Sequence, residues 1–174
     1  MWRIILCSLA LIAQPVTAES LTATLTGLGS GSLGGQAFTG ATVDMVFTGD
    51  TSTYGFTQMP IGNAGSVTLQ SVIGSIAGTV SGFGNFLVEP AAVIMADLTG
   101  LSDPPSFSVI VAIVLDGTAG NMTFSAGQPF NLLSDTAFSM DLFGGYGTNT
   151  ISTNAGNFTL SSVTGFTFTS TVTS

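Results

Sequence analysis

Carboxylates supply nearly all the charge of this chain. Nine Asp and Glu residues stand against one basic residue, Arg3, and the sequence has no histidine. Two carboxyl groups are enough for glycoside hydrolysis when the surroundings raise the pKa of one of them. Two pairs that lie close in sequence are candidates for that role: Asp97 with Asp103, and Asp135 with Asp141.

The residue types that most other catalytic mechanisms need are absent from most of the sequence. The single cysteine, Cys7, and the single basic residue both lie within residues 1–18. From Glu19 to Ser174 there is therefore no imidazole, thiol or amine side chain to act as a base, a nucleophile or a transition-metal ligand. We expect no catalytic, cofactor-binding or metal-binding residues, and a glycoside hydrolase that uses an Asp pair is the enzymatic alternative.

Glycines at positions 29, 31 and 34 match the spacing G-x-G-x-x-G of dinucleotide-binding loops. That motif needs a helix after the loop to receive the pyrophosphate, whereas the residues that follow alternate apolar and polar side chains as a strand does. We therefore interpret Gly34-Gly35 as the two-residue turn of a hairpin, in which both turn residues need a positive φ. Asp44 would then lie on the polar face of the second strand, and Asp50 would cap the turn after it.

Residues 144–152, GGYGTNTIS, match the calcium nonapeptide G-G-x-G-x-D-x-U-x, with Asn149 in place of the aspartate. Such repeats bind Ca²⁺ when successive turns stack and share their oxygens. The next nonapeptide, TNAGNFTLS, keeps only Gly156 and Leu160 of the pattern. We interpret the segment as a glycine-rich loop, and a Ca²⁺-stabilised structural domain is the alternative.

Residues 1–18, MWRIILCSLALIAQPVTA, have the three parts of a secretory signal peptide: a basic residue, an apolar run, and a small-residue exit that ends at Ala18. The apolar run is too short for a bilayer core, which takes about 20 residues. We expect export with cleavage after Ala18, so the mature chain would hold no cationic side chain. Such a chain cannot neutralise phosphates, which argues against nucleic acid and anionic membrane surfaces as partners.

Apolar residues recur with a period of two, the pattern of half-buried strands. Leu21, Ala23 and Leu25 alternate with threonines, and residues 43–48 alternate likewise around a break at Val46. Further strands are expected at 66–71, 75–81, 86–88, 92–98, 107–115, 121–125, 138–142, 156–161 and 166–172, with a helical turn at 130–135. The apolar run 107–115 is expected to be buried on both sides.

Many short strands separated by glycine-rich turns predict an all-β fold. We expect residues 19–174 to form one domain, an antiparallel β-sandwich, with a closed β-barrel or a β-solenoid as the alternatives. A solenoid would show a fixed repeat period, which this sequence lacks.

Threonines occupy alternate positions in the first and the last expected strands, at 22, 24 and 26 and at 167, 169, 171 and 173. We interpret these rows as the solvent side of the strands, because threonine is a good strand former. The alternative is a flat Thr-x-Thr ladder of the kind that orders water on ice-binding faces.

Three parts of the chain carry a family resemblance: the leader, the stretch GSLGGQAFTGATVDMVFTGDTS and the closing SSVTGFTFTSTVTS. Together they resemble the secreted bacterial proteins that carry a PEP-CTERM sorting signal. Those proteins are the exosortase substrates of biofilm-forming Gram-negative bacteria. The resemblance is to the ectodomain only. Such proteins continue into Val-Pro-Glu-Pro, a transmembrane helix and a basic cluster, and the sequence up to Ser174 shows none of these features. The resemblance implies an exported protein without assigned site residues.

These observations together predict a secreted, non-enzymatic structural or surface protein of the extracellular matrix or cell envelope. A carbohydrate-binding or carboxylate-based carbohydrate-active domain is the alternative of another class. Matrix polysaccharide or other surface proteins are the partners we expect, and the sequence does not indicate an oligomeric state.

Overall fold

The structure is a computed structural model that describes residues 19–60, 66–97, 109–114, 121–126, 133, 136–142 and 149–174. These residues form ten strands and one short 3-10 helix. The strands are β1 (Ser20–Leu33), β2 (Gln36–Asp50), β3 (Gly55–Pro60), β4 (Ser66–Val80), β5 (Gly84–Asp97), β6 (Val109–Val114), β7 (Asn121–Ala126), β8 (Thr136–Leu142), β9 (Thr150–Thr153) and β10 (Gly156–Thr173), and the 3-10 helix η1 spans Thr51–Thr53. The leader at 1–18 lies outside the described residues, and so does the helical turn expected at 130–135, apart from Leu133. Within the described part of the chain, no helix has the length and apolar character needed to cross a membrane.

All the strands belong to one antiparallel sheet, which confirms the prediction of an all-β, antiparallel fold. Pairing follows the order β1-β2-β4-β5-β6-β7-β8-β10-β9, and β3 lies beside β4. In addition, β10 pairs along β1, from Ser20 opposite Thr173 to Leu33 opposite Phe158. The hydrogen-bonded strand pairs can therefore be followed from β1 through β2 to β10 and back to β1. Because this pairing joins the two ends of the described chain, the fold differs from a solenoid, in which each repeat contacts only its neighbours.

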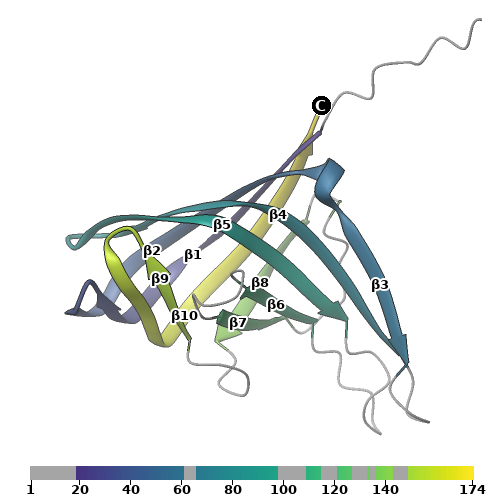
Figure 1. The fold of residues 1–174 in the computed structure, drawn as a ribbon. Coiled ribbons are helices and arrows are strands. Elements are labelled where there is room, and N and C mark those ends of the chain that lie inside the picture. The colour runs from purple at the N-terminus through teal and green to yellow at the C-terminus, as the bar shows by residue number, and fades with distance from the viewer. Residues whose placement is uncertain are drawn as a thin grey trace, which may run out of the picture.

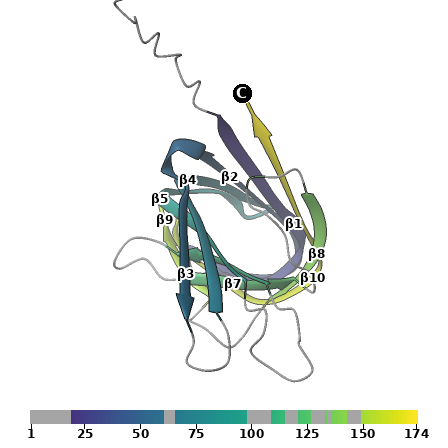
Figure 2. The ribbon, with the colours of Figure 1, turned by 90° about the vertical axis from the view of Figure 1, so that its right-hand side faces the viewer.

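The sheet is strongly curled, as Figure 1 shows, and Figure 2 places β3, β4 and β5 on one wall of the curl and β1, β8 and β10 on the other. Two facing walls are a feature of a β-sandwich, whereas continuous strand pairing between the walls is a feature of a β-barrel. In either arrangement the inner face must be apolar, because it is removed from water.

Alternate residues of the long strands line that inner face. Leu21, Ala23 and Leu25 of β1 are buried, whereas the threonines between them are partly exposed. The same alternation holds in β2 and β10, where the buried residues are Val43, Met45, Phe47, Phe166, Phe168 and Ser170. The expected alternation is thus confirmed. Val46 does not break its strand, since it continues β2 with a partly exposed side chain on the outer face.

A cluster of phenylalanine rings fills one end of the interior. Phe158 of β10 is fully buried and stacks on Phe86 of β5, with ring centroids 4.5 Å apart, and on Phe38 of β2, at 6.2 Å. Phe38 also contacts Phe83, at 5.6 Å. Stacked rings of this kind contribute about 0.5–1.5 kcal/mol each beyond the area they bury. The cluster therefore joins three strands that lie far apart in the sequence.

The turn of the β9–β10 hairpin is hydrogen-bonded to β5 beside this cluster. The backbone N–H of Asn154 donates to the carbonyl of Leu87 (3.1 Å), and the N–H of Leu87 donates to the side-chain oxygen of Asn154 (2.7 Å). One turn residue thus satisfies both backbone groups of a strand residue, as a neighbouring strand would. We name this pair of hydrogen bonds the Asn154 clip.

The first hairpin has the geometry that its glycines require. Gly34 and Gly35 have φ values of +57° and +84°, and Leu33 pairs with Gln36 across them. The interpretation as a two-residue hairpin turn is confirmed, because the residues after the glycines form β2 and no helix begins there.

Several expected strands are parts of longer ones. The segments 66–71 and 75–80 belong to β4, and 86–88 and 92–97 belong to β5. In the β4–β5 pairing, Glu89 and Pro90 of β5 stand against the single residue Ser75 of β4, and this bulge interrupts the alternation of β5 between Val88 and Ala91, which explains the apparent gap in that strand. The pattern missed β3 and β9, which are short. Burial of the run 107–115 stays a prediction, since only the backbone of β6 is described there.

Candidate functional site

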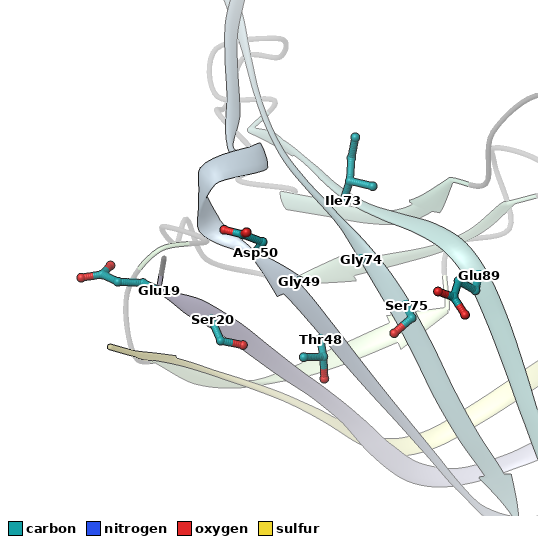
Figure 3. A pocket seen from close by; sticks show the side chains of 9 residues that line it. All are labelled: Glu19, Ser20, Thr48, Gly49, Asp50, Ile73, Gly74, Ser75 and Glu89. Carbon is teal, nitrogen blue, oxygen red and sulfur yellow. The ribbon is translucent and has the colours of Figure 1, made fainter. Parts of the chain in front are cut away.

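The outer surface of the sheet is hollowed near the start of β1, where β1, β2, β4 and β5 lie side by side. The hollow has a cavity volume of about 480 Å³. Figure 3 shows its lining from close by: carboxylates at Glu19, Asp50 and Glu89, hydroxyls at Ser20, Thr48 and Ser75, the exposed side chain of Ile73, and two glycines. We call this feature the outer hollow.

Two glycines contribute backbone to the lining of the outer hollow. Gly49 and Gly74 face each other across β2 and β4. A Cβ on Gly74 would overlap the carbonyl oxygen of Thr48 and lie 2.7 Å from the Cα of Gly49, and a Cβ on Gly49 would lie 2.7 Å from a methyl of Val72. The strands therefore approach closely only because side chains are missing. The extra residue of the nearby bulge lies in β5, where Glu89 and Pro90 stand against Ser75, so β5 bends at the same point.

The strand register explains why hydroxyl groups gather at the outer hollow. Ser20 lies opposite Asp50 in the β1–β2 pairing, and Thr48 lies opposite Ser75 in the β2–β4 pairing. Directly opposed residues share one face of a sheet, so this register places the hydroxyls on the outer face together. An outer face with closely spaced hydroxyls can exchange hydrogen bonds with a ligand that is itself rich in hydroxyls.

Asp50 caps η1, as the sequence predicts. Its carboxylate accepts a hydrogen bond from the backbone N–H of Ser52 (2.7 Å). This bond, together with one from the Ser52 side chain, holds the pKa of Asp50 below its ordinary value. The backbone of Glu19 is held nearby, since its carbonyl accepts from the N–H of Thr51 (2.9 Å).

The three carboxylates stand apart around the rim. Figure 3 shows Glu19, Asp50 and Glu89 at separate places, none pointing at another. A general acid for glycoside hydrolysis needs a raised pKa, and the pKa of Asp50 is shifted the other way. Among the residues that the structure describes, no group of three or more His, Cys, Asp or Glu side chains is arranged to hold a metal ion. The chemistry that the outer hollow supports is therefore hydrogen bonding and attraction of positive charge.

The carboxylate pairs suggested by spacing stay a prediction, because one member of each pair lies outside the described residues. Asp97 ends β5, but only its backbone is described, and its partner Asp103 lies outside the described residues. Asp135 lies outside them as well, and Asp141 is exposed on β8 opposite Ser125. Asp44 has the expected place on the outer face of β2, where it accepts a hydrogen bond from the hydroxyl of Thr26.

The calcium nonapeptide falls partly outside the described residues, which resume at Asn149. From there the chain forms an antiparallel hairpin in which Thr150 pairs with Thr159 and Thr153 with Gly156. Stacked calcium turns would run parallel to each other, so the hairpin does not have the geometry of the repeat. Asn149 has φ +48°, and its buried side-chain oxygen has no hydrogen-bond partner within the described part of the chain.

The outer hollow was missed from sequence because its parts are far apart along the chain. Glu19, Asp50 and Glu89 do not recur at a fixed interval in the sequence. Only the pairing of the strands brings them to the lining of one hollow. The one local signal was Asp50, followed by residues that form a capped turn.

Comparison with known proteins finds no matching family model, no similar curated protein and no similar solved structure.

Proposed function

We propose that the protein is a secreted, non-enzymatic structural or surface component of the extracellular matrix or cell envelope. The observation that carries this proposal is the division of the sheet into two faces. The inner face is packed with apolar side chains, and the outer face of the strands around β1 presents threonine and serine hydroxyls. Such a domain is a stable, hydrated scaffold.

Two features of the sequence support the same proposal. The expected leader carries the lone basic residue, so the mature protein would be uniformly acidic, which favours solubility and repels other acidic chains. The resemblance to exosortase substrates points to the same compartment. No residue is given a catalytic role.

The test is the location of the protein and the effect of its removal. In the source organism, we expect an antibody to the chain to find it in the matrix or envelope fraction, and deletion of its gene to weaken matrix cohesion with no loss of any enzymatic activity in the medium. Recovery from the cytosol alone would contradict the proposal.

A second candidate is binding of a carbohydrate in the outer hollow. The hydroxyls and carboxylates that line the hollow favour it, because sugars are recognised by such hydrogen-bonding groups. If the hollow binds sugar, Glu89→Gln should reduce retention of the protein on matrix polysaccharide, whereas Asp141→Asn, an exposed carboxylate on β8, should not. Equal retention of both variants would contradict this candidate.

A further inference from the structure

Export as proposed above would give the mature chain a cationic group that its side chains do not supply. Hydrolysis of the peptide bond between Ala18 and Glu19 consumes one water molecule and leaves a carboxylate on Ala18 and an α-ammonium on Glu19. The ordinary pKa of an α-amino group is about 7.7–8.0, so the group is mostly protonated at pH 7. Residues 19–174 contain no Lys, Arg or His and nine Asp and Glu residues. The α-ammonium would therefore be the single cationic group among nine side-chain carboxylates.

The structure places the nitrogen of Glu19 at the outer hollow. Glu19 lies in the lining, directly before β1 begins at Ser20. The carbonyl of Glu19 accepts two hydrogen bonds from Thr51, one from the backbone N–H and one from the hydroxyl, each 2.9 Å long. These bonds hold the backbone of Glu19 against the point where β2 ends at Asp50 and η1 begins. We call this point the β2–η1 corner.

The strand register brings Asp50 to the same place. Ser20 lies directly opposite Asp50 in the β1–β2 pairing, and Thr51, which binds Glu19, is the next residue of the chain. A residue that is hydrogen-bonded across an antiparallel pair turns both its C=O and its N–H toward the partner, so the nitrogen of Glu19 is expected on the side of the β2–η1 corner. Figure 3 shows Asp50 and Glu19 on one side of the hollow and Glu89 on the other.

Asp50 can accept a second partner. One of its oxygens accepts the backbone N–H of Ser52, at 2.7 Å, and a carboxylate has two oxygens with about four acceptor sites. The Ser52 bonds hold the pKa of Asp50 below its ordinary value, so the side chain is ionised at neutral pH. Because the cap already orients this side chain, an ion pair with it has less side-chain entropy to overcome.

Other titratable groups surround the nitrogen at different places. The lining contributes the side chain of Glu19 itself and Glu89 of β5, and Tyr54 follows η1. β4 has no charged residue, and β10 ends beside β1 with Thr173, which is uncharged. Glu89 lies on β5, and β4 stands between β5 and β2 in the sheet. Asp50 is therefore the carboxylate of another strand that the register brings closest to the α-amino group.

We propose that removal of the leader creates an ion pair between the α-ammonium of Glu19 and the carboxylate of Asp50. This pair joins the first residue of the mature chain to the β2–η1 corner. The inference rests on the proposed export, because only cleavage after Ala18 produces the amine; in the precursor the same nitrogen is an uncharged amide. Processing thus supplies the outer hollow with a cation from the chain itself.

The lack of lysine makes the test selective, since the α-amino group is the only amine of residues 19–174. The exported protein is treated with acetic anhydride over a range of pH, and mass spectrometry gives the rate of acetylation at Glu19. Only the uncharged amine reacts, so the midpoint of the rate profile gives its pKa. A nearby carboxylate raises that pKa. We expect a rise of about half a pH unit from Asp50, which makes acetylation at pH 7 about threefold slower.

Two variants assign the effect. Asp50→Asn removes the charge but keeps an acceptor for the Ser52 N–H, since asparagine is also a good cap residue, and acetylation at pH 7 should become about threefold faster. Glu89→Gln removes one charge from the other side of the hollow and should leave the rate near that of the wild type. Circular dichroism checks that both variants are folded. For the wild type alone, salt at about 1 M should lower the midpoint, because it screens exposed charges.

A midpoint that falls with Asp50→Asn and stays with Glu89→Gln supports the ion pair. Equal midpoints in the wild type and Asp50→Asn overturn it, and so do equal shifts in both variants, which would indicate only the general negative charge of the chain. A midpoint below the ordinary range also overturns it, since burial without a partner lowers the pKa of an amine. Intact mass separates this inference from the proposed export. An exported chain that does not begin at Glu19 overturns both, whereas one that begins there with a midpoint indifferent to Asp50 overturns the ion pair alone.

Discussion

Replacement of Phe158 by alanine tests the interior cluster. Phe158 lies on β10, and its ring is fully buried and stacks on Phe86 of β5, at 4.5 Å, and on Phe38 of β2. A buried Phe→Ala change costs about 3–5 kcal/mol. Because this change also removes two ring contacts, we expect the upper part of that range, about 4–5 kcal/mol.

This loss is large compared with the total free energy of unfolding. Domains of this kind have a free energy of unfolding of about 5–15 kcal/mol. For a urea m value of about 2 kcal/mol/M, the midpoint of unfolding should fall by about 2 M. Residues 19–174 contain no tryptophan, so far-UV circular dichroism is the appropriate signal.

Phe56→Ala is the matched control. Phe56 is 60% exposed on the short strand β3, and the same chemical change there should cost less than about 1 kcal/mol. Equal losses for the two variants would refute the reasoning, because they would mean that the ring at position 158 is no more buried than the one at 56.

Three further predictions concern single contacts. Asn154→Ala breaks the side-chain half of the Asn154 clip, and hydrogen exchange of the Leu87 amide should speed up while the core amides stay protected; unchanged exchange would contradict the contact. Because the folded pKa of Asp50 is lowered, its carboxylate stabilises the fold above the unfolded pKa of about 3.9, and this contribution is lost as the pH falls through the lower folded value. Asp50→Ala should therefore lower the urea midpoint at pH 7 more than at pH 2, and an equal effect at both would argue against the cap. Gly74→Ala should destabilise by about 1–3 kcal/mol or more, since its Cβ would meet backbone, whereas Gly55→Ala meets only the side chain of Ser71, at 2.7 Å, and should cost less in the same urea titration.

Local features of the fold could be predicted from sequence. The alternation in β1, β2 and β10 follows from strand geometry alone, whichever strands lie beside them. The turn at Gly34-Gly35 and the cap at Asp50 likewise depend on neighbouring residues, and both are observed.

The register between β1 and β10 could not be predicted. Both strands repeat threonine at every second position, so a slip of two residues would leave every side chain on the same face. The register is set by the packing of the buried residues between the ends of the chain. The outer hollow depends on a further tertiary event, the close approach of Gly49 and Gly74, which no local pattern indicates.

We propose that the protein works outside the cell as a scaffold whose mature chain lacks cationic side chains. The most direct test is the intact mass of the protein recovered from the extracellular fraction. The account predicts a polypeptide that begins at Glu19 and has lost Arg3 and Cys7. An exported protein that retains residues 1–18 would contradict it.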